Sequence, residues 1–90
     1  MASYKIGWKH SAEKDLRKID KQHLLRILNA VALLADDPFP ANHRKLAGSD
    51  SSYRLRVGDY RVIYQVDHGE RTVTIFYVRH RRDVYRNLPR

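Results

Sequence analysis

Arginines at alternating positions of one extended segment are the residues of this sequence best suited to chemistry. The segment runs from Ser52 to Arg61 with the sequence SYRLRVGDYR. Successive side chains of a strand point to opposite faces, so Arg54 and Arg56 share one face and Leu55 lies on the other. Two adjacent guanidinium groups repel each other, but their planar forks match a chain of phosphates. The segment therefore predicts a phosphate-binding surface.

A second basic segment, VRHRRDVY, follows at residues 78–85. Arg81 adds a cation to the predicted surface. His80 is the only side chain of this segment whose unperturbed pKa lies near neutrality, which makes it a candidate for proton transfer. Arg61 and Val62 are consecutive residues of a predicted strand, so their side chains point to opposite faces. An open-face position for Arg61 is therefore favoured over a role that only flanks the strand.

The charge of the chain indicates the class of partner. Its 90 residues carry a net charge of +8, and all six lysines precede residue 46, so the second half is basic through arginine alone. A chain this basic is expected to bind an acidic partner. The alternative is a basic surface that serves solubility.

Composition also argues against several kinds of site. There are no cysteines, so a disulfide framework and a thiolate metal site are both excluded. The histidines show no metal-binding spacing, and no apolar run has the length of a signal peptide or a membrane span. We therefore expect one cytoplasmic domain over residues 1–90, without a cofactor, a metal or a membrane partner.

Hydrophobic periodicity predicts the elements that position these residues. They are a strand over Tyr4–Trp8, a helix from His10-Ser11 to Asp20, a helix over Lys21–Ala35, strands over Tyr53–Val57, Tyr60–Asp67 and Thr72–Arg79, and a helical turn over Asp83–Leu88. Ser11 is expected to cap the first helix, with Glu13 and Asp15 as acids in its first turn. Residues 41–52 are predicted to be a polar connector.

The order of these elements predicts a small α+β domain. An αα-hairpin packs on a mostly antiparallel, four-stranded sheet that includes the N-terminal strand, and a short helical turn ends the chain. The strands over Tyr60–Asp67 and Thr72–Arg79 are apolar on both faces and are therefore expected to be central.

Together with the helical hairpin, three motifs resemble the RelE/ParE toxin superfamily, and its RelE branch most. The motifs are KLAG at residues 45–48, YRLRVGDYRVIY at residues 53–64 and VRHRRDVYR at residues 78–86. The resemblance covers essentially the whole chain. It implies a cytoplasmic toxin of a type II toxin-antitoxin system that cuts mRNA in the A site of the 30S ribosomal subunit. It also implies neutralisation by a RelB-like antitoxin, which we expect to be acidic, and contact with operator DNA only through the toxin-antitoxin complex.

The resemblance also implies which residues cleave RNA. Metal-free cleavage uses the substrate's 2′-hydroxyl as nucleophile, and it needs a base, cations around the phosphorane and a proton for the departing 5′-oxygen. By resemblance, catalytic positions fall on Arg54, Arg56, Arg61 and Arg81, and a substrate-stacking or substrate-orienting position falls on Tyr85.

One departure from the family pattern concerns the base. In the best-known RelE the positions of Arg54 and Arg56 hold lysines, one of which is thought to be the base. Arginine stays protonated and cannot take that role. His80 is therefore our candidate for the general acid or base, and Arg81 is expected to contact the scissile phosphate.

Two other functions fit the same residues. One is a ParE-like inhibitor that binds DNA gyrase, and the other is a non-catalytic RNA- or DNA-binding module. ParE branches typically lack the full basic set on the sheet and the arrangement of His80, Arg81 and Tyr85. The sequence therefore favours the mRNA endonuclease. On sequence alone, Tyr85 is equally well explained as a structural cap over the sheet edge.

Overall fold

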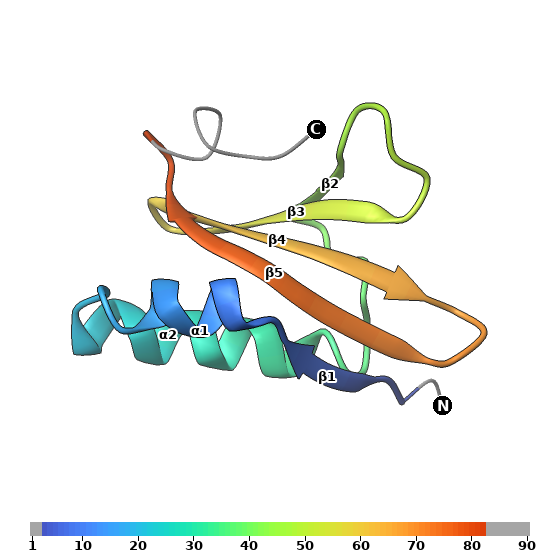
Figure 1. The fold of residues 1–90 in the computed structure, drawn as a ribbon, viewed down its shortest axis with the longest axis horizontal. Coiled ribbons are helices and arrows are strands. Elements are labelled where there is room, and N and C mark those ends of the chain that lie inside the picture. The colour runs from blue at the N-terminus through green and yellow to red at the C-terminus, as the bar shows by residue number, and fades with distance from the viewer. Residues whose placement is uncertain (1–2, 83–90) are drawn as a thin grey trace.

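A five-stranded sheet with two helices on one face makes up residues 3–82, the part of the chain that this computed structural model describes (Figure 1). The elements are β1 (Lys5–Trp8), α1 (His10–Leu16), α2 (Lys21–Leu33), β2 (His43–Lys45), β3 (Ser52–Val57), β4 (Tyr60–Asp67) and β5 (Thr72–His80). The strand order is β1-β5-β4-β3-β2, in which β1 runs parallel to β5 and the other neighbours are antiparallel. The predicted α+β class and the inner positions of β4 and β5 are confirmed.

The sheet has five strands rather than the predicted four because β2 joins its edge. β2 is a three-residue strand that pairs antiparallel with β3, with Arg44 opposite Arg54. Its residues lie in the segment that was predicted to be a polar connector. A strand this short has no hydrophobic alternation to reveal it, and only its pairing with β3 defines it.

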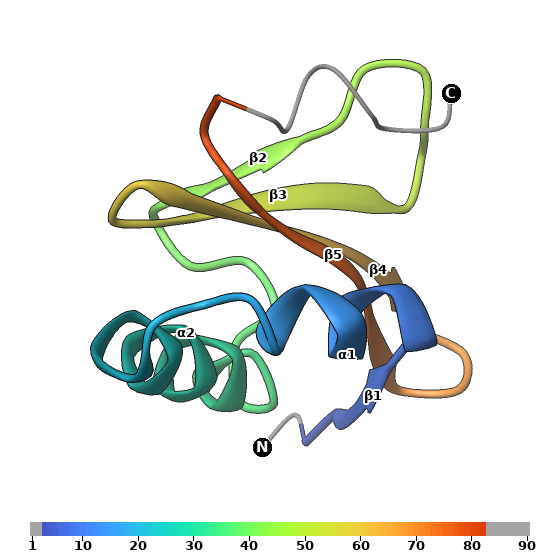
Figure 2. The same ribbon diagram turned by 60° about the vertical axis from the view of Figure 1, so that its left-hand side comes forward.

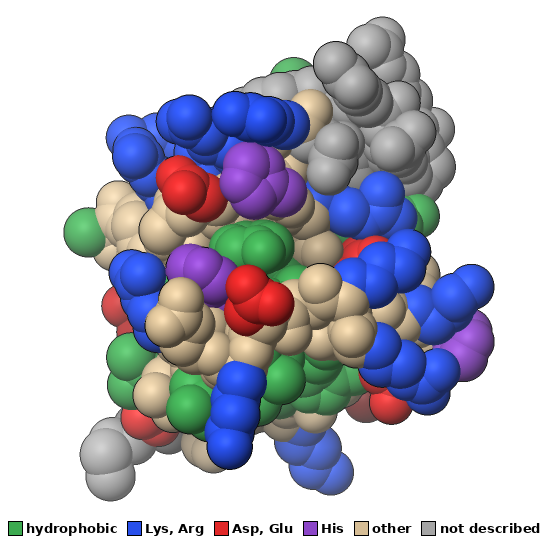
Figure 3. Space-filling model, turned by 90° about the vertical axis from the view of Figure 1, so that its left-hand side faces the viewer, with side chains coloured by type: hydrophobic (Ala, Val, Ile, Leu, Met, Phe, Trp, Pro, Cys, Tyr) green, Lys and Arg blue, Asp and Glu red, His purple; other side chains and the backbone are tan. Residues whose placement is uncertain are grey.

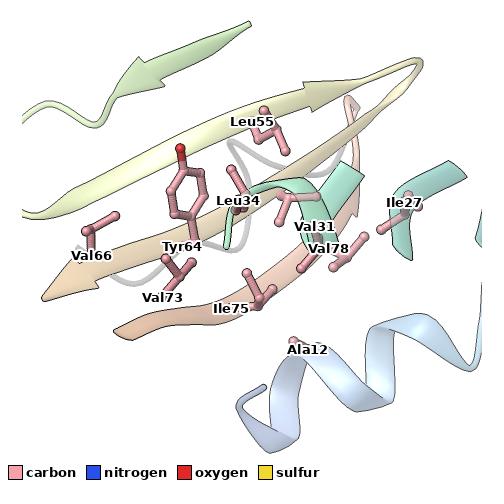
Figure 4. Close-up of a cluster of buried hydrophobic side chains, with 11 residues drawn as sticks. Ala12, Ile27, Val31, Leu34, Leu55, Tyr64, Val66, Val73, Ile75 and Val78 are labelled. Atoms are coloured by element: carbon pink, nitrogen blue, oxygen red, sulfur yellow. The ribbon is translucent and has the colours of Figure 1, made fainter. Parts of the chain in front are cut away.

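The core lies between the helices and the inner face of the sheet, as Figure 4 shows. Both helices lie on that face, and α1 runs beside β5 (Figure 2). The fully enclosed side chains of the helical layer are Ala12, Ile27, Val31 and Leu34, the last at the C-cap of α2. Those from the strands include Leu55, Val62, Tyr64, Val73 and Ile75. Within residues 3–82, no helix is both long enough and apolar enough to cross a membrane.

The start of α1 differs from the prediction. Lys9, not Ser11, occupies the N-cap position, and the hydroxyl of Ser11 donates a hydrogen bond to the carbonyl of Phe76. Pairing of β1 with β5 stops at Ile75, so the next carbonyl of β5 has an open edge that Ser11 satisfies. Both helices are also shorter than predicted, ending at Leu16 and Leu33. The predicted helical turn over residues 83–88 lies outside the described residues.

Tyr64 is a buried phenol whose titration is expected to weaken the fold at alkaline pH. Its side chain is 0% exposed and its hydroxyl donates to the Pro38 carbonyl at 2.6 Å. Burial raises the pKa of this phenol far above its ordinary value of 10.0. The unfolded chain therefore loses this proton first, so the stabilisation is complete below about pH 10 and declines above it.

We expect the free energy of unfolding of the natural protein to fall faster with pH than that of a Tyr64→Phe variant, by about 1.4 kcal/mol per pH unit above about pH 10. Below that pH the variant is expected to be less stable by about 1 kcal/mol, because the Pro38 carbonyl loses its donor. Urea unfolding of both proteins from pH 8 to pH 12 measures the difference. Parallel stability curves above pH 10 would contradict the assignment.

Candidate functional site

The predicted arginines of β3 and β4 gather on the face of the sheet that points away from the helices. Leu55 is buried in the core, so its neighbours Arg54 and Arg56 project to the other face. Arg56 lies directly across from Arg61 in the β3–β4 pair. A cavity of about 240 Å³ is lined by Asn42, Arg44, Arg54, Arg56 and Arg61. Four of these lining residues are arginines, so the cavity is suited to an anion.

Local contacts hold the rim of this cavity. The Arg61 guanidinium donates from Nη1 to the carbonyls of Gly58 and Tyr60, at 3.1 and 3.0 Å. The turn that joins β3 to β4 needs a left-handed residue at Gly58, where φ is +59° and glycine has no Cβ to oppose it. Asn42 Nδ2 donates to the carbonyl of Arg56 at 2.6 Å. These contacts help to fix the edge of the cavity where Arg56 and Arg61 lie opposite each other.

Arg44 and Asn42 were missed by the sequence analysis. Both belong to the stretch that was predicted to be a connector, and Arg44 reaches the cavity only because β2 pairs with β3. Arg44 Nη1 donates to the carbonyl of His43 at 2.9 Å. The basic pair Arg44-Lys45 shortly before β3 is the one signal in the sequence that points to this edge.

His80 lies on the opposite face of the sheet from the three arginines. It pairs with Tyr60, which packs against the core, and the two rings meet edge to face with centroids 5.5 Å apart. Arg79, the preceding residue, pairs with Arg61 instead. His80 Nδ1 accepts a hydrogen bond from the backbone N–H of Arg82 at 3.3 Å, which favours the tautomer protonated at Nε2.

A second cavity, of about 420 Å³, contains His80 on this helix side of the sheet. Its lining residues are Asp15, Lys18, Ile19, Tyr60, Val78, Arg79 and His80. Figure 3 looks onto this end of the molecule and shows histidine side chains with acidic side chains beside them and lysine and arginine side chains farther out. The structure therefore separates the candidate proton-transfer group from the arginine cavity by the thickness of the sheet.

Arg81 lies just past the end of β5, beside the turn between β3 and β4. Its backbone N–H donates to the carbonyl of Asp59 at 2.7 Å, and its Nε is 4.0 Å from Asp59 Oδ1. This places Arg81 at the same end of the sheet as Arg61, whose guanidinium contacts the same turn. Tyr85 lies outside the described residues.

A buried carboxylate that the sequence analysis placed in the first turn of α1 anchors the end of β5. Asp15 is 8% exposed, and its Oδ2 accepts hydrogen bonds from the Val78 N–H and from Arg79 Nε, both at 3.0 Å. The Val78 N–H lies at the edge of β5 beyond the last residue of β1, so Asp15 takes the place of a neighbouring strand.

Within residues 3–82, no three His, Cys, Asp or Glu side chains are grouped in a way that could hold a metal ion.

Comparisons with known proteins match this chain to one family. Residues 6–85 match the family described as "ParE toxin of type II toxin-antitoxin system, parDE". Toxin RelG of Mycobacterium tuberculosis is 33% identical over 87 residues, which cover 92% of this chain and 97% of that protein.

Two solved structures show the same fold. The archaeal RelE-RelB complex from Pyrococcus horikoshii OT3 contains a chain that is 31% identical, with a TM-score of 0.79 over 88% of this chain and 96% of that one. The toxin-antitoxin complex RelBE2 from Mycobacterium tuberculosis contains a chain that is 26% identical, with a TM-score of 0.76 over 87% of this chain and 98% of that one.

Proposed function

The chain belongs to the RelE branch of the RelE/ParE superfamily of type II toxins, and we propose that it is a ribosome-dependent endoribonuclease that cuts mRNA in the A site. The observation that carries this proposal is the cavity on the open face, which is lined by arginines from three strands. Such a cluster is suited to the charge that develops on a phosphorane during cleavage.

In the proposed reaction the substrate's 2′-oxygen attacks the adjacent phosphorus, and the bond to the 5′-oxygen breaks. Arg54, Arg56 and Arg61 hold the non-bridging oxygens, and Arg81 contacts the scissile phosphate from the end of the sheet. The 2′-hydroxyl loses its proton to a base, and the departing 5′-oxygen gains one from an acid. Tyr85 is proposed to stack on or orient the substrate.

His80 is the proposed general acid or base. His80 lies on the helix side at the end of β5, so this role requires the scissile phosphate to lie over that end, beside Arg81 and the Arg61 rim of the arginine cavity. We expect His80→Ala to slow cleavage by about 10²-fold or more and to remove an inflection between about pH 5 and pH 8 from the rate profile. Single-turnover cleavage of ribosome-bound mRNA across that range is the measurement. A variant that cleaves at the natural rate would restrict the chemistry to the open face.

The proposed partner that neutralises the toxin is an acidic, RelB-like antitoxin. Support comes from the net charge of +8 and from the relatives solved as RelE-RelB and RelBE2 complexes. Operator DNA is proposed to be contacted only through the toxin-antitoxin complex. Because the proposed substrate is mRNA on the ribosome, the proposed site of action is the cytoplasm.

Primer extension on translating ribosomes, with purified protein added, tests the proposed function against its alternatives. New mRNA ends that appear only when ribosomes are present are the expected result. DNA breaks that depend on gyrase, without RNA cleavage, would instead show a ParE-like inhibitor. Binding to RNA or DNA with neither product would show a non-catalytic module.

A further inference from the structure

An irregularity in β5 places two consecutive aromatic residues on the same face of the sheet. Tyr64 pairs with Ile75, whereas its neighbour Ile63 pairs with Tyr77, so Phe76 is an extra residue on β5. Ile75 and Val78 are both buried in the core. Phe76 and Tyr77 therefore both lie on the side away from the core, where a regular strand would have sent one of them inward.

These two rings do not belong to the core. Both residues are partly exposed, and neither is among the side chains that pack against the core cluster. Each ring instead has a cation over it. Lys9 Nζ is 5.5 Å from the centroid of the Phe76 ring, and Arg79 Cζ is 4.8 Å from that of Tyr77. Burial in the core therefore does not account for the two rings.

Arg79 is held in place over Tyr77, at the position of β5 opposite Arg61. It also lines the cavity that contains His80. Its Nε donates to the buried Asp15 carboxylate at 3.0 Å, which limits the positions that the guanidinium can adopt. Across the sheet Arg79 pairs with Arg61, and Arg61 pairs with Arg56. The aromatic pair thus continues the row of cations that crosses β3 and β4.

We propose that Phe76, Tyr77 and Arg79 form a stacking subsite for unpaired bases of the RNA strand whose phosphates occupy the arginine cavity. The identity of that strand as RNA rests on the proposed function. The outer plane of the Arg79 guanidinium, supported by Tyr77, offers a stacking surface for one base, and the Phe76 ring offers another. Lys9 is then free to contact a flanking phosphate. Cations that follow a backbone, combined with rings that accept any base, are the usual means of holding single strands.

The test measures the affinity of the natural protein and of its Tyr77→Ala and Phe76→Ala variants for two RNA probes. One probe is a labelled single strand of ~10 nucleotides, and the other has the same backbone with abasic sites throughout. Fluorescence anisotropy at several salt concentrations gives the affinities. Each variant is expected to bind the base-containing probe about 5- to 100-fold more weakly and the abasic probe almost unchanged. The dependence of affinity on salt should stay as in the natural protein, because no phosphate contact is lost.

Two controls separate stacking from folding. Tyr77→Phe keeps the ring and should keep the affinity, and Leu33→Ala removes a side chain that is 68% exposed on α2 and should have no effect. Equal losses for both probes, or no loss for either, would overturn the subsite. A Tyr77→Ala variant that loses antitoxin binding but keeps RNA binding would overturn it too.

The stacking subsite and the proposed endonuclease activity can be refuted independently of each other. A natural protein that prefers the base-containing probe but leaves ribosome-bound mRNA intact would refute the endonuclease and retain the subsite. A protein that cleaves mRNA equally well with and without the Tyr77 ring, and binds both probes equally, would retain the endonuclease and refute the subsite.

Discussion

Replacing Arg56 with alanine is expected to slow ribosome-dependent RNA cleavage by about 10²- to 10³-fold, the loss typical when one group that stabilises a developing anion is removed. Arg56 is exposed, lines the cavity and lies across from Arg61. Its side chain is not part of the core, so the free energy of unfolding should change by no more than about 0.5 kcal/mol. Single-turnover cleavage at saturating protein, together with urea unfolding, measures both effects.

Arg17→Ala is the matched control for this prediction. It removes the same charge from an exposed residue at the C-cap of α1, away from the cavity. The control should cleave at nearly the natural rate. Equal losses in the two variants would mean that general attraction to RNA, rather than a phosphate held at the cavity, explains the activity.

Replacing Asp15 with alanine is expected to lower the free energy of unfolding by about 3–5 kcal/mol. The substitution leaves the Val78 N–H and the Arg79 guanidinium without the carboxylate that both contact at 3.0 Å. A domain of this size has a total stability of about 5–15 kcal/mol, so the melting temperature should fall steeply. Urea unfolding followed by circular dichroism measures the change.

Two further variants, Asp15→Asn and Asp20→Ala, serve as comparisons for Asp15→Ala. The asparagine can still accept from the Val78 N–H but lacks the charge that pairs with Arg79, so an intermediate loss is expected. Asp20 lies at the N-cap of α2, is exposed and makes no side-chain capping hydrogen bond, so its removal should have little effect. An Asp15→Ala variant as stable as Asp20→Ala would refute the anchoring role.

The bulge in β5 explains the largest difference between the predicted and observed site. On a regular strand that starts with Ile75 facing the core, His80 would lie on the open face and Arg79 on the helix side. The extra residue Phe76 exchanges the two, because the faces alternate with a period of two and a one-residue shift reverses them. No local pattern in residues 72–80 marks where that shift falls.

The sequence by itself determined those features that follow from the regular spacing of side chains along one segment of the chain. The spacing of apolar residues predicted both helices and four of the five strands, and simple alternation put Arg54 and Arg56 on one face. What only the tertiary structure decided depends on partners distant in the chain. Arg44 joins the cavity through the pairing of β2 with β3, and Asp15 is an anchor rather than a first-turn acid because the edge of β5 ends against α1. These outcomes are set by which backbone groups remain unpaired after the sheet forms, and a linear pattern does not contain that information.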